Sequence, residues 1–178
     1  MWRFAKPRAL YLLEALPYPR LLAFTLLGLS AGLLLPYAFA GDFSEWTRGE
    51  YFRFPPGRRE GGLSLVFFLE SLGKNLLVLF ALTRLLPWVE GTFLPNWPPG
   101  GWVSRLYLLL VAPVTGVLAS PFGLPHGGGY LLTVAPLALG EFATFTAAAC
   151  WGRRAEGRGA LALLLLALYE TWAAAYLL

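Results

Sequence analysis

Side chains that ionise or form strong hydrogen bonds interrupt otherwise apolar stretches of this chain, among them Glu70, Lys74, Asn75, Glu141 and Glu170. A charged group inside a membrane is costly unless it is paired, so such residues are candidates for function. Lys74 and Glu141 are each the twelfth residue of an apolar stretch. At that depth both lie about 16 Å into a hydrocarbon layer of about 30 Å. The two are therefore predicted to pair near the middle of the membrane.

The spacing of the charges in the second apolar stretch also predicts which way its helix faces. At 100° per residue, Glu70, Lys74 and Arg84 fall within about 80° of arc, with Asn75 to one side. Glu70 precedes Lys74 by four residues, which is the favourable order for an ion pair on one helix. We expect this charged face to point into a helix bundle or a wet cavity, and away from lipid.

The single histidine, His126, lies in a break between two apolar stretches, where residues 120–131 read Ser-Pro-Phe-Gly-Leu-Pro-His-Gly-Gly-Gly-Tyr-Leu. Proline and glycine at this density, with Pro125 and Gly127 flanking the histidine, predict a turn rather than a continuous helix. Irregular backbone at membrane depth is tolerated only where protein or water satisfies its polar groups, so the turn is also a candidate site. His126 either caps the turn through its ring N–H or acts as a proton-responsive group.

Taken together, these patterns predict one internal polar cleft, open to the outer side and lined by Glu70, Lys74, Asn75, His126, Glu141 and Glu170. The alternative is that the same groups pair with one another and specify helix packing without any ligand, a role that buried ion pairs often have. Both interpretations stay open on the sequence alone.

The sequence offers little support for an enzyme or for a bound cofactor. No Ser or Cys has an evident partner histidine, and no phosphate-cradling glycine loop follows a strand. With one cysteine, Cys150, and one histidine, neither an internal disulfide nor a zinc site with soft ligands is expected. The formal charge of +4 is interpreted as a topology signal and not as a nucleic-acid footprint.

Composition places the chain among polytopic membrane proteins. Of its 178 residues, 57% are hydrophobic and 13% are charged, whereas soluble domains carry about 25% charged residues. We predict an all-α transmembrane bundle that forms a single integral membrane domain over residues 1–178. Its five spans are expected at residues 21–40, 63–87, 103–120, 130–151 and 160–178, each long enough to cross a bilayer.

The remaining segments predict the surroundings of those spans. Residues 1–20 suit an interfacial helix that Pro17 and Pro19 end, and residues 41–62 suit a polar outer loop. If the N-terminus is cytoplasmic, nine Lys and Arg residues lie inside and four lie in that outer loop. The excess of cations inside predicts a multi-pass protein of the cytoplasmic (inner) membrane with a cytoplasmic N-terminus.

Small residues at helical spacing mark two candidate surfaces for close helix packing. Gly28 and Gly32 are four residues apart in the first apolar stretch, and Ala112, Gly116 and Ser120 form a stripe in the third. Such spacings let two helix backbones approach closely.

Two stretches resemble the stage II sporulation protein M family of small polytopic membrane proteins. One is Phe-Leu-Glu-Ser-Leu-Gly-Lys-Asn-Leu-Leu-Val at residues 68–78, and the other is the Leu-Pro-His-Gly turn at residues 124–127 with the alanine-rich stretch after it. The family has a glutamate three residues after the glycine, where this chain has Tyr130. The resemblance covers residues 63–152 and agrees with the family's order of segments.

The resemblance implies a non-enzymatic integral membrane component, a scaffold or permease-like subunit of a larger assembly. Besides the lipid bilayer, its expected partners are other proteins or further copies of the chain. The alternative is a small-molecule or ion transporter, or a substrate-capture protein, that works in its own right. A transporter needs a ligand-sized cavity of several hundred Å³ in the charged cleft, whereas a scaffold keeps that cleft closed by pairing.

Overall fold

The computed structural model describes residues 7–39, 65–93, 100–118, 120 and 127–176, which are helical apart from short connections and contain no strand. The helices follow one another as α1 (Arg8–Glu14), α2 (Tyr18–Ala38), α4 (Leu65–Phe80), the π-helical η1 (Ala81–Leu85), α5 (Leu86–Phe93), α6 (Trp102–Leu118), α7 (Gly127–Trp151), the 3₁₀-helical η2 (Gly152–Ala155) and α8 (Glu156–Tyr176). The all-α prediction is confirmed for these residues. The predicted outer loop at 41–62 lies outside them.

Proline determines where the first two helices separate. The short helix predicted within residues 1–20 is α1, which ends at Glu14, and Pro17 then occupies the N-cap position of α2. Pro19 does not end α1 as expected, because it lies in the first turn of α2. A proline costs little there, since the first N–H groups of a helix have no intrahelical partner.

The second predicted span is longer than expected and does not end at Pro87. Helix α4 continues through the π-helical turn η1 into α5, which reaches Phe93. Pro87 has no N–H to donate to the carbonyl four residues earlier, and its ring crowds that carbonyl. A widened π turn immediately before the proline accommodates it without breaking the helix.

Helices α2 and α6 pack along their length through the two predicted small-residue surfaces. A Cβ added to Gly32 would lie 2.9 Å from the backbone nitrogen of Val117, and one added to Gly116 would lie 2.9 Å from that of Leu33. The Ser120 hydroxyl donates to the carbonyl oxygen of Leu33 at 2.9 Å. The backbones therefore meet at a distance that only glycine permits.

The expected break between the third and fourth apolar stretches is also present, since α6 ends at Leu118 and α7 begins at Gly127. Gly127 is the first residue of α7 and does not lie in the turn, contrary to prediction. At the other end of α7, Gly152 has a φ of +55° and begins the η2 turn into α8. A left-handed backbone of this kind favours glycine.

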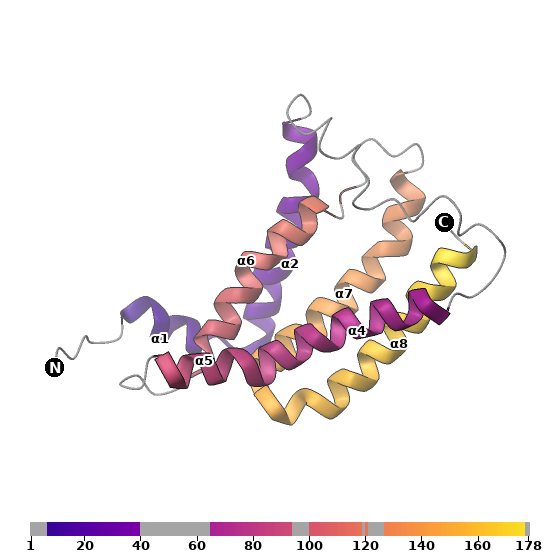
Figure 1. Cartoon of the computed structure of the whole chain (residues 1–178). Helices are drawn as coiled ribbons and strands as arrows, with labels where there is room; N and C mark the ends of the chain where they lie inside the picture. Colours follow the sequence, from indigo (N-terminus) through magenta and orange to yellow (C-terminus); the bar gives the residue numbers. More distant parts are fainter. Residues whose placement is uncertain (1–6, 40–64, 94–99, 119, 121–126, 177–178) are drawn as a thin grey trace.

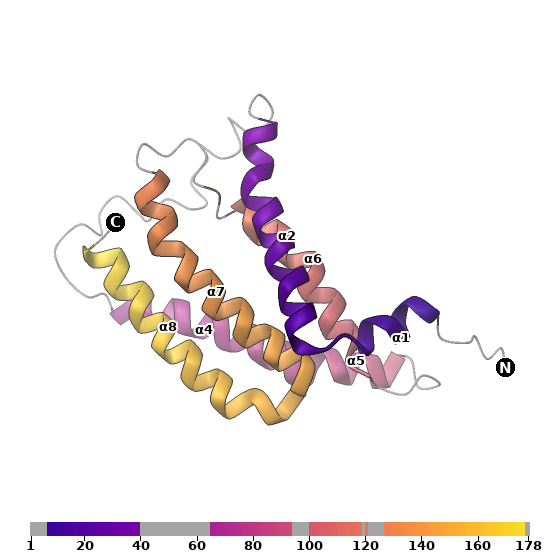
Figure 2. The same ribbon diagram turned by 180° about the vertical axis from the view of Figure 1, so that it is seen from behind.

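Figures 1 and 2 show α7 between the α2–α6 pair and the α4–α8 pair, and α7 contacts members of both. A cluster of buried residues joins the elements at their common end, with Leu21 from α2, Leu79 from α4, Leu108 from α6, Phe145 from α7 and Leu163 from α8. The core thus holds α7 in place from two sides.

Among the residues that the structure describes, three helical stretches are long and apolar enough to cross a membrane, at Tyr18–Ala38, Leu65–Phe93 and Val134–Ala173. The third contains the η2 turn, and Trp102–Val117 is a shorter apolar helix. These helices indicate a membrane protein. By length, each can cover a hydrocarbon layer that needs about 20 residues.

Candidate functional site: a polar seam between three helices

A row of hydrogen bonds joins α4 to α7 and α8 through four polar side chains, Ser71, Asn75, Glu141 and Glu170, which we call the polar seam. The Asn75 amide donates to Oε1 of Glu141 at 2.6 Å. One turn away on α4, the Ser71 hydroxyl donates to Oε2 of Glu170. Ser71 is buried and the other three side chains are half-buried.

Helix geometry explains why these four residues meet. Ser71 and Asn75 are four residues apart, so they share a face of α4, and that face packs against α8 and α7. Glu141 and Glu170 come from α7 and α8, which form an antiparallel hairpin (Figure 1). Their carboxyl groups are close enough to interact electrostatically. The seam gives each carboxyl group one neutral donor from α4.

The seam pairs polar side chains of α4 with those of α7 and α8 through hydrogen bonds. Interhelical hydrogen bonds of this kind contribute about 0.6 to 1.7 kcal/mol each in membrane proteins, because the separated helices also find partners. Among the described residues, no group of three or more His, Cys, Asp or Glu side chains could hold a metal ion. The arrangement is thus suited to holding helices together.

The orientation predicted for α4 is wrong. Glu70, Lys74 and Arg84, expected to point into the bundle, are all exposed, while Ser71 and Leu79 are buried. The inward face of α4 is the one on which Ser71 and Asn75 find hydrogen-bond acceptors, the carboxyl groups of Glu170 and Glu141.

The predicted partners of these charges change as a result. Glu141 accepts a hydrogen bond from Asn75, and Lys74, the partner expected for it, points elsewhere. Arg84 binds Glu156 at the start of α8 through two hydrogen bonds of 2.8 and 2.7 Å. This ion pair is exposed, so it contributes little to stability.

The histidine turn is not part of the site that the structure describes. His126 and Pro125 lie outside the described residues, and Gly127 is described as the start of α7. Five of the six predicted lining residues are described, and the structure brings together three of them, Asn75, Glu141 and Glu170. Sequence reasoning missed Ser71, the fourth member of the seam, although its i, i+4 spacing to Asn75 was a usable signal.

Sequence reasoning also missed a buried arginine that ties α1 to α6. Arg105 is 8% exposed, and its Nη1 donates to the carbonyl oxygens of Leu13 at 2.7 Å, Leu16 at 3.4 Å and Glu14. The carbonyls of Leu13 and Glu14 belong to the last turn of α1, and that of Leu16 follows it. A cation beside the carbonyl end of a helix is favourable. The sequence marks Arg105 only as a charge at the start of a span.

A second buried charge, Glu90 of α5, was not identified either. Its side chain is 1% exposed, and its Oε1 accepts a hydrogen bond from the backbone N–H of Gly100 at 2.8 Å. The carboxylate thus connects α5 to the segment before α6. A lone acid in a Trp-, Pro- and Gly-rich stretch gives no periodic signal from which this contact could be predicted.

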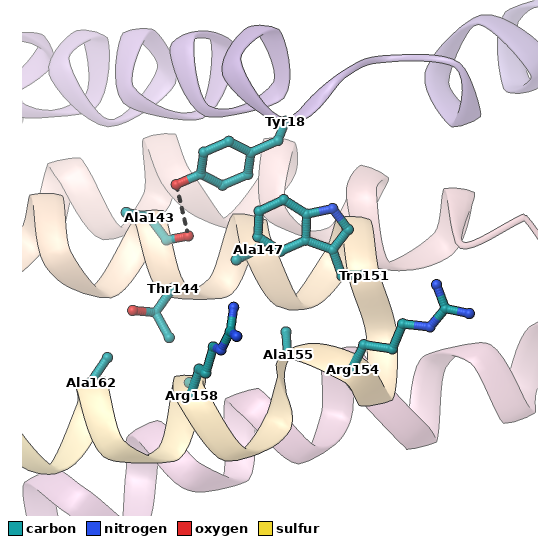
Figure 3. Close-up of a pocket in the computed structure, with 10 residues that line it drawn as sticks. Tyr18, Ala143, Thr144, Ala147, Trp151, Arg154, Ala155, Arg158 and Ala162 are labelled. Atoms are coloured by element: carbon teal, nitrogen blue, oxygen red, sulfur yellow. Dashed lines mark hydrogen bonds between the residues drawn. The ribbon is translucent and has the colours of Figure 1, made fainter.

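A cavity of about 470 Å³ lies away from the seam, between the start of α2, the end of α7 and the start of α8. Figure 3 shows that Tyr18, Trp151 and Arg158 face it from these three helices. None of the seam residues lines it. The structure therefore separates the closed polar contacts from the open volume.

Comparison of the chain with protein families, with curated proteins and with solved structures gives no match. The resemblance to the stage II sporulation protein M family stays a prediction.

Proposed function

We propose that the protein is a non-enzymatic integral membrane component, a scaffold or permease-like subunit that works within a larger assembly. The observation that carries this proposal is the exposure of Lys74 on the outer face of α4. Lys74 lies inside Leu65–Phe93, a stretch apolar enough to cross a membrane. A charged side chain facing lipid there costs about 3 kcal/mol or more. A second protein surface that covers this face removes the cost.

The closed seam supports the same proposal. A transporter that works alone needs a ligand-sized volume beside its intramembrane charges. In this structure the carboxyl groups of Glu141 and Glu170 instead accept hydrogen bonds from Asn75 and Ser71. The alternative, a transporter or substrate-capture protein in its own right, requires the seam to open. Within the proposal, the chain crosses the inner membrane five times with its N-terminus and the η2 turn on the cytoplasmic side.

Site-specific photo-crosslinking in native membranes tests for the covering partner. A photoreactive phenylalanine analogue replaces Leu77, which is 69% exposed and lies on the Glu70 and Lys74 face. The matched control carries it at Leu165 of α8, which is 59% exposed. We expect a discrete protein adduct from position 77, identified by mass spectrometry as a partner or a second copy, and none from position 165.

Lipid adducts alone at both positions would contradict the proposal. Purification of the tagged protein from its host membranes in a mild detergent then identifies the class of assembly. Stoichiometric recovery of an ATPase or of cell-wall enzymes supports the subunit role and names the process. Recovery of the protein alone with a small molecule bound supports the transporter alternative.

A further inference from the structure

We propose that the cavity between α2, α7 and α8 is a binding site for one anionic phospholipid. Its phosphate would bind at Arg158, with Arg154 at the rim, and the upper part of an acyl chain would lie along the small residues of α7 and α8. This inference concerns a different face from the proposed partner surface on α4. The result of testing one proposal does not affect the other.

The walls of the cavity are suited to a hydrocarbon chain. Helix α7 contributes Ala143 and Ala147, and α8 contributes Gly159 and Ala162. Small residues at these positions leave room between two helices that otherwise pack together, and they offer no donors that a polar ligand would need. A volume of about 470 Å³ is in the range of small-molecule sites.

An aromatic pair closes one side of the cavity. The rings of Tyr18 and Trp151 stack with their centroids 5.0 Å apart and their planes at 19°. The Tyr18 hydroxyl donates to the carbonyl oxygen of Ala143 at 3.5 Å, as Figure 3 shows. Tyr and Trp are enriched where a membrane protein meets the headgroup layer. The pair thus places the cavity at the depth where a lipid phosphate lies.

The cations at the cavity have no protein partner in the part of the chain that the structure describes. Neither Arg154 nor Arg158 makes a hydrogen bond or an ion pair there, and both are exposed. The one acid of the turn, Glu156, is already bound by Arg84. In Figure 3 the guanidinium group of Arg158 points into the space between α7 and α8, while Arg154 extends outward.

Charge and shape together select the ligand. A guanidinium fork matches phosphate oxygens geometrically, and basic pockets between membrane helices bind anionic headgroups. A soluble phosphate would use the arginines but would leave the apolar walls uncovered. A zwitterionic lipid would fill the walls but would bring a choline cation towards the arginines. An anionic phospholipid satisfies both features.

Native mass spectrometry of the delipidated full chain measures the binding directly. Dioleoyl phosphatidylglycerol is titrated against dioleoyl phosphatidylcholine, and we expect one phosphatidylglycerol to bind with clear preference. Arg158→Gln is expected to weaken its binding about fivefold, the effect of removing about 1 kcal/mol per cation. The matched control, Arg153→Gln, removes an exposed arginine of the same turn that does not line the cavity, and should bind as the wild type does.

A second variant tests the apolar walls and separates the lipid from a soluble phosphate. Ala162→Leu fills the cavity and keeps both arginines, so we expect it to bind phosphatidylglycerol more weakly than the wild type. In a separate competition experiment with the wild type, we expect that glycerol phosphate does not displace phosphatidylglycerol. Equal binding of the two lipids, or unchanged binding in Arg158→Gln, would overturn the proposal. Displacement of the lipid by glycerol phosphate, with normal binding in Ala162→Leu, would assign the site to a soluble phosphate and also overturn it. Far-ultraviolet circular dichroism confirms that each variant is folded.

Discussion

At the scale of single residues, the neutral side chain of Asn75 takes the position that a charged one was expected to hold. It donates to Glu141 at 2.6 Å from the inward face of α4, whereas Lys74 is exposed. Depth along the helix could be predicted from the sequence, because each residue adds a fixed rise. Rotation about the helix axis could not, because it depends on which neighbours the other helices offer.

Replacing Asn75 by Leu should lower the free energy of unfolding by about 1 kcal/mol, because Glu141 then loses its donor. Reversible unfolding in mixed micelles measures this change. Lys74→Leu is the matched control, with the same product residue one position earlier on the exposed face, and we expect it to have little effect in the purified chain. An equal loss in Lys74→Leu would show that the lysine is the partner of Glu141 after all.

Arg105→Met should destabilise the protein by about 2 kcal/mol and release α1 first, because hydrogen bonds to a charged group contribute about 1.5 to 3 kcal/mol. The carbonyl oxygens of Leu13, Glu14 and Leu16 would lose their shared donor. Limited proteolysis between residues 7 and 17 measures the release. Arg8→Met, at an exposed site of α1, should leave the cleavage rate unchanged, and equal rates in the two variants would contradict this role.

At the scale of elements, the sequence predicts the helices better than their ends. The break before α7, the short α1 and the apolar core of each long helix follow from composition and periodicity. The continuation of the helix past Pro87 depends on a π turn at Ala81–Leu85, which has no distinct sequence signal. Four residues from three helices meet in the seam. The sequence predicts that Asn75, Glu141 and Glu170 lie together, but it does not predict Ser71 or which donor meets which carboxyl group.

The pairing of α2 with α6 can be tested by filling its contact. Gly116→Ala should destabilise the protein by about 1 to 3 kcal/mol, the usual cost of overpacking, because its new methyl group would lie 2.9 Å from the Leu33 nitrogen. Gly73→Ala on α4 is the control, since nothing lies within 4 Å of an added Cβ there. Alanine at that site should be neutral or stabilising by up to about 1 kcal/mol. Thermal unfolding of both variants in detergent decides the matter, and equal melting temperatures would contradict close packing at Gly116.

At the scale of the whole molecule, the protein has three separate polar or charged surfaces. The seam joins α4 to α7 and α8, the charged face of α4 is the proposed partner surface, and the arginine-lined cavity is the proposed lipid site. A scaffold role requires that the seam is closed to water. Substituted-cysteine labelling in permeabilised native membranes, with Cys150→Ala as the background, tests this most directly. Arg153→Cys, at an exposed site of the turn, is the positive control. In the time that Arg153→Cys needs for complete labelling by a water-soluble thiol reagent, Ser71→Cys and Asn75→Cys should remain unlabelled. Labelling of Asn75→Cys at the rate of Arg153→Cys would show a wet pathway between the helices and contradict the account.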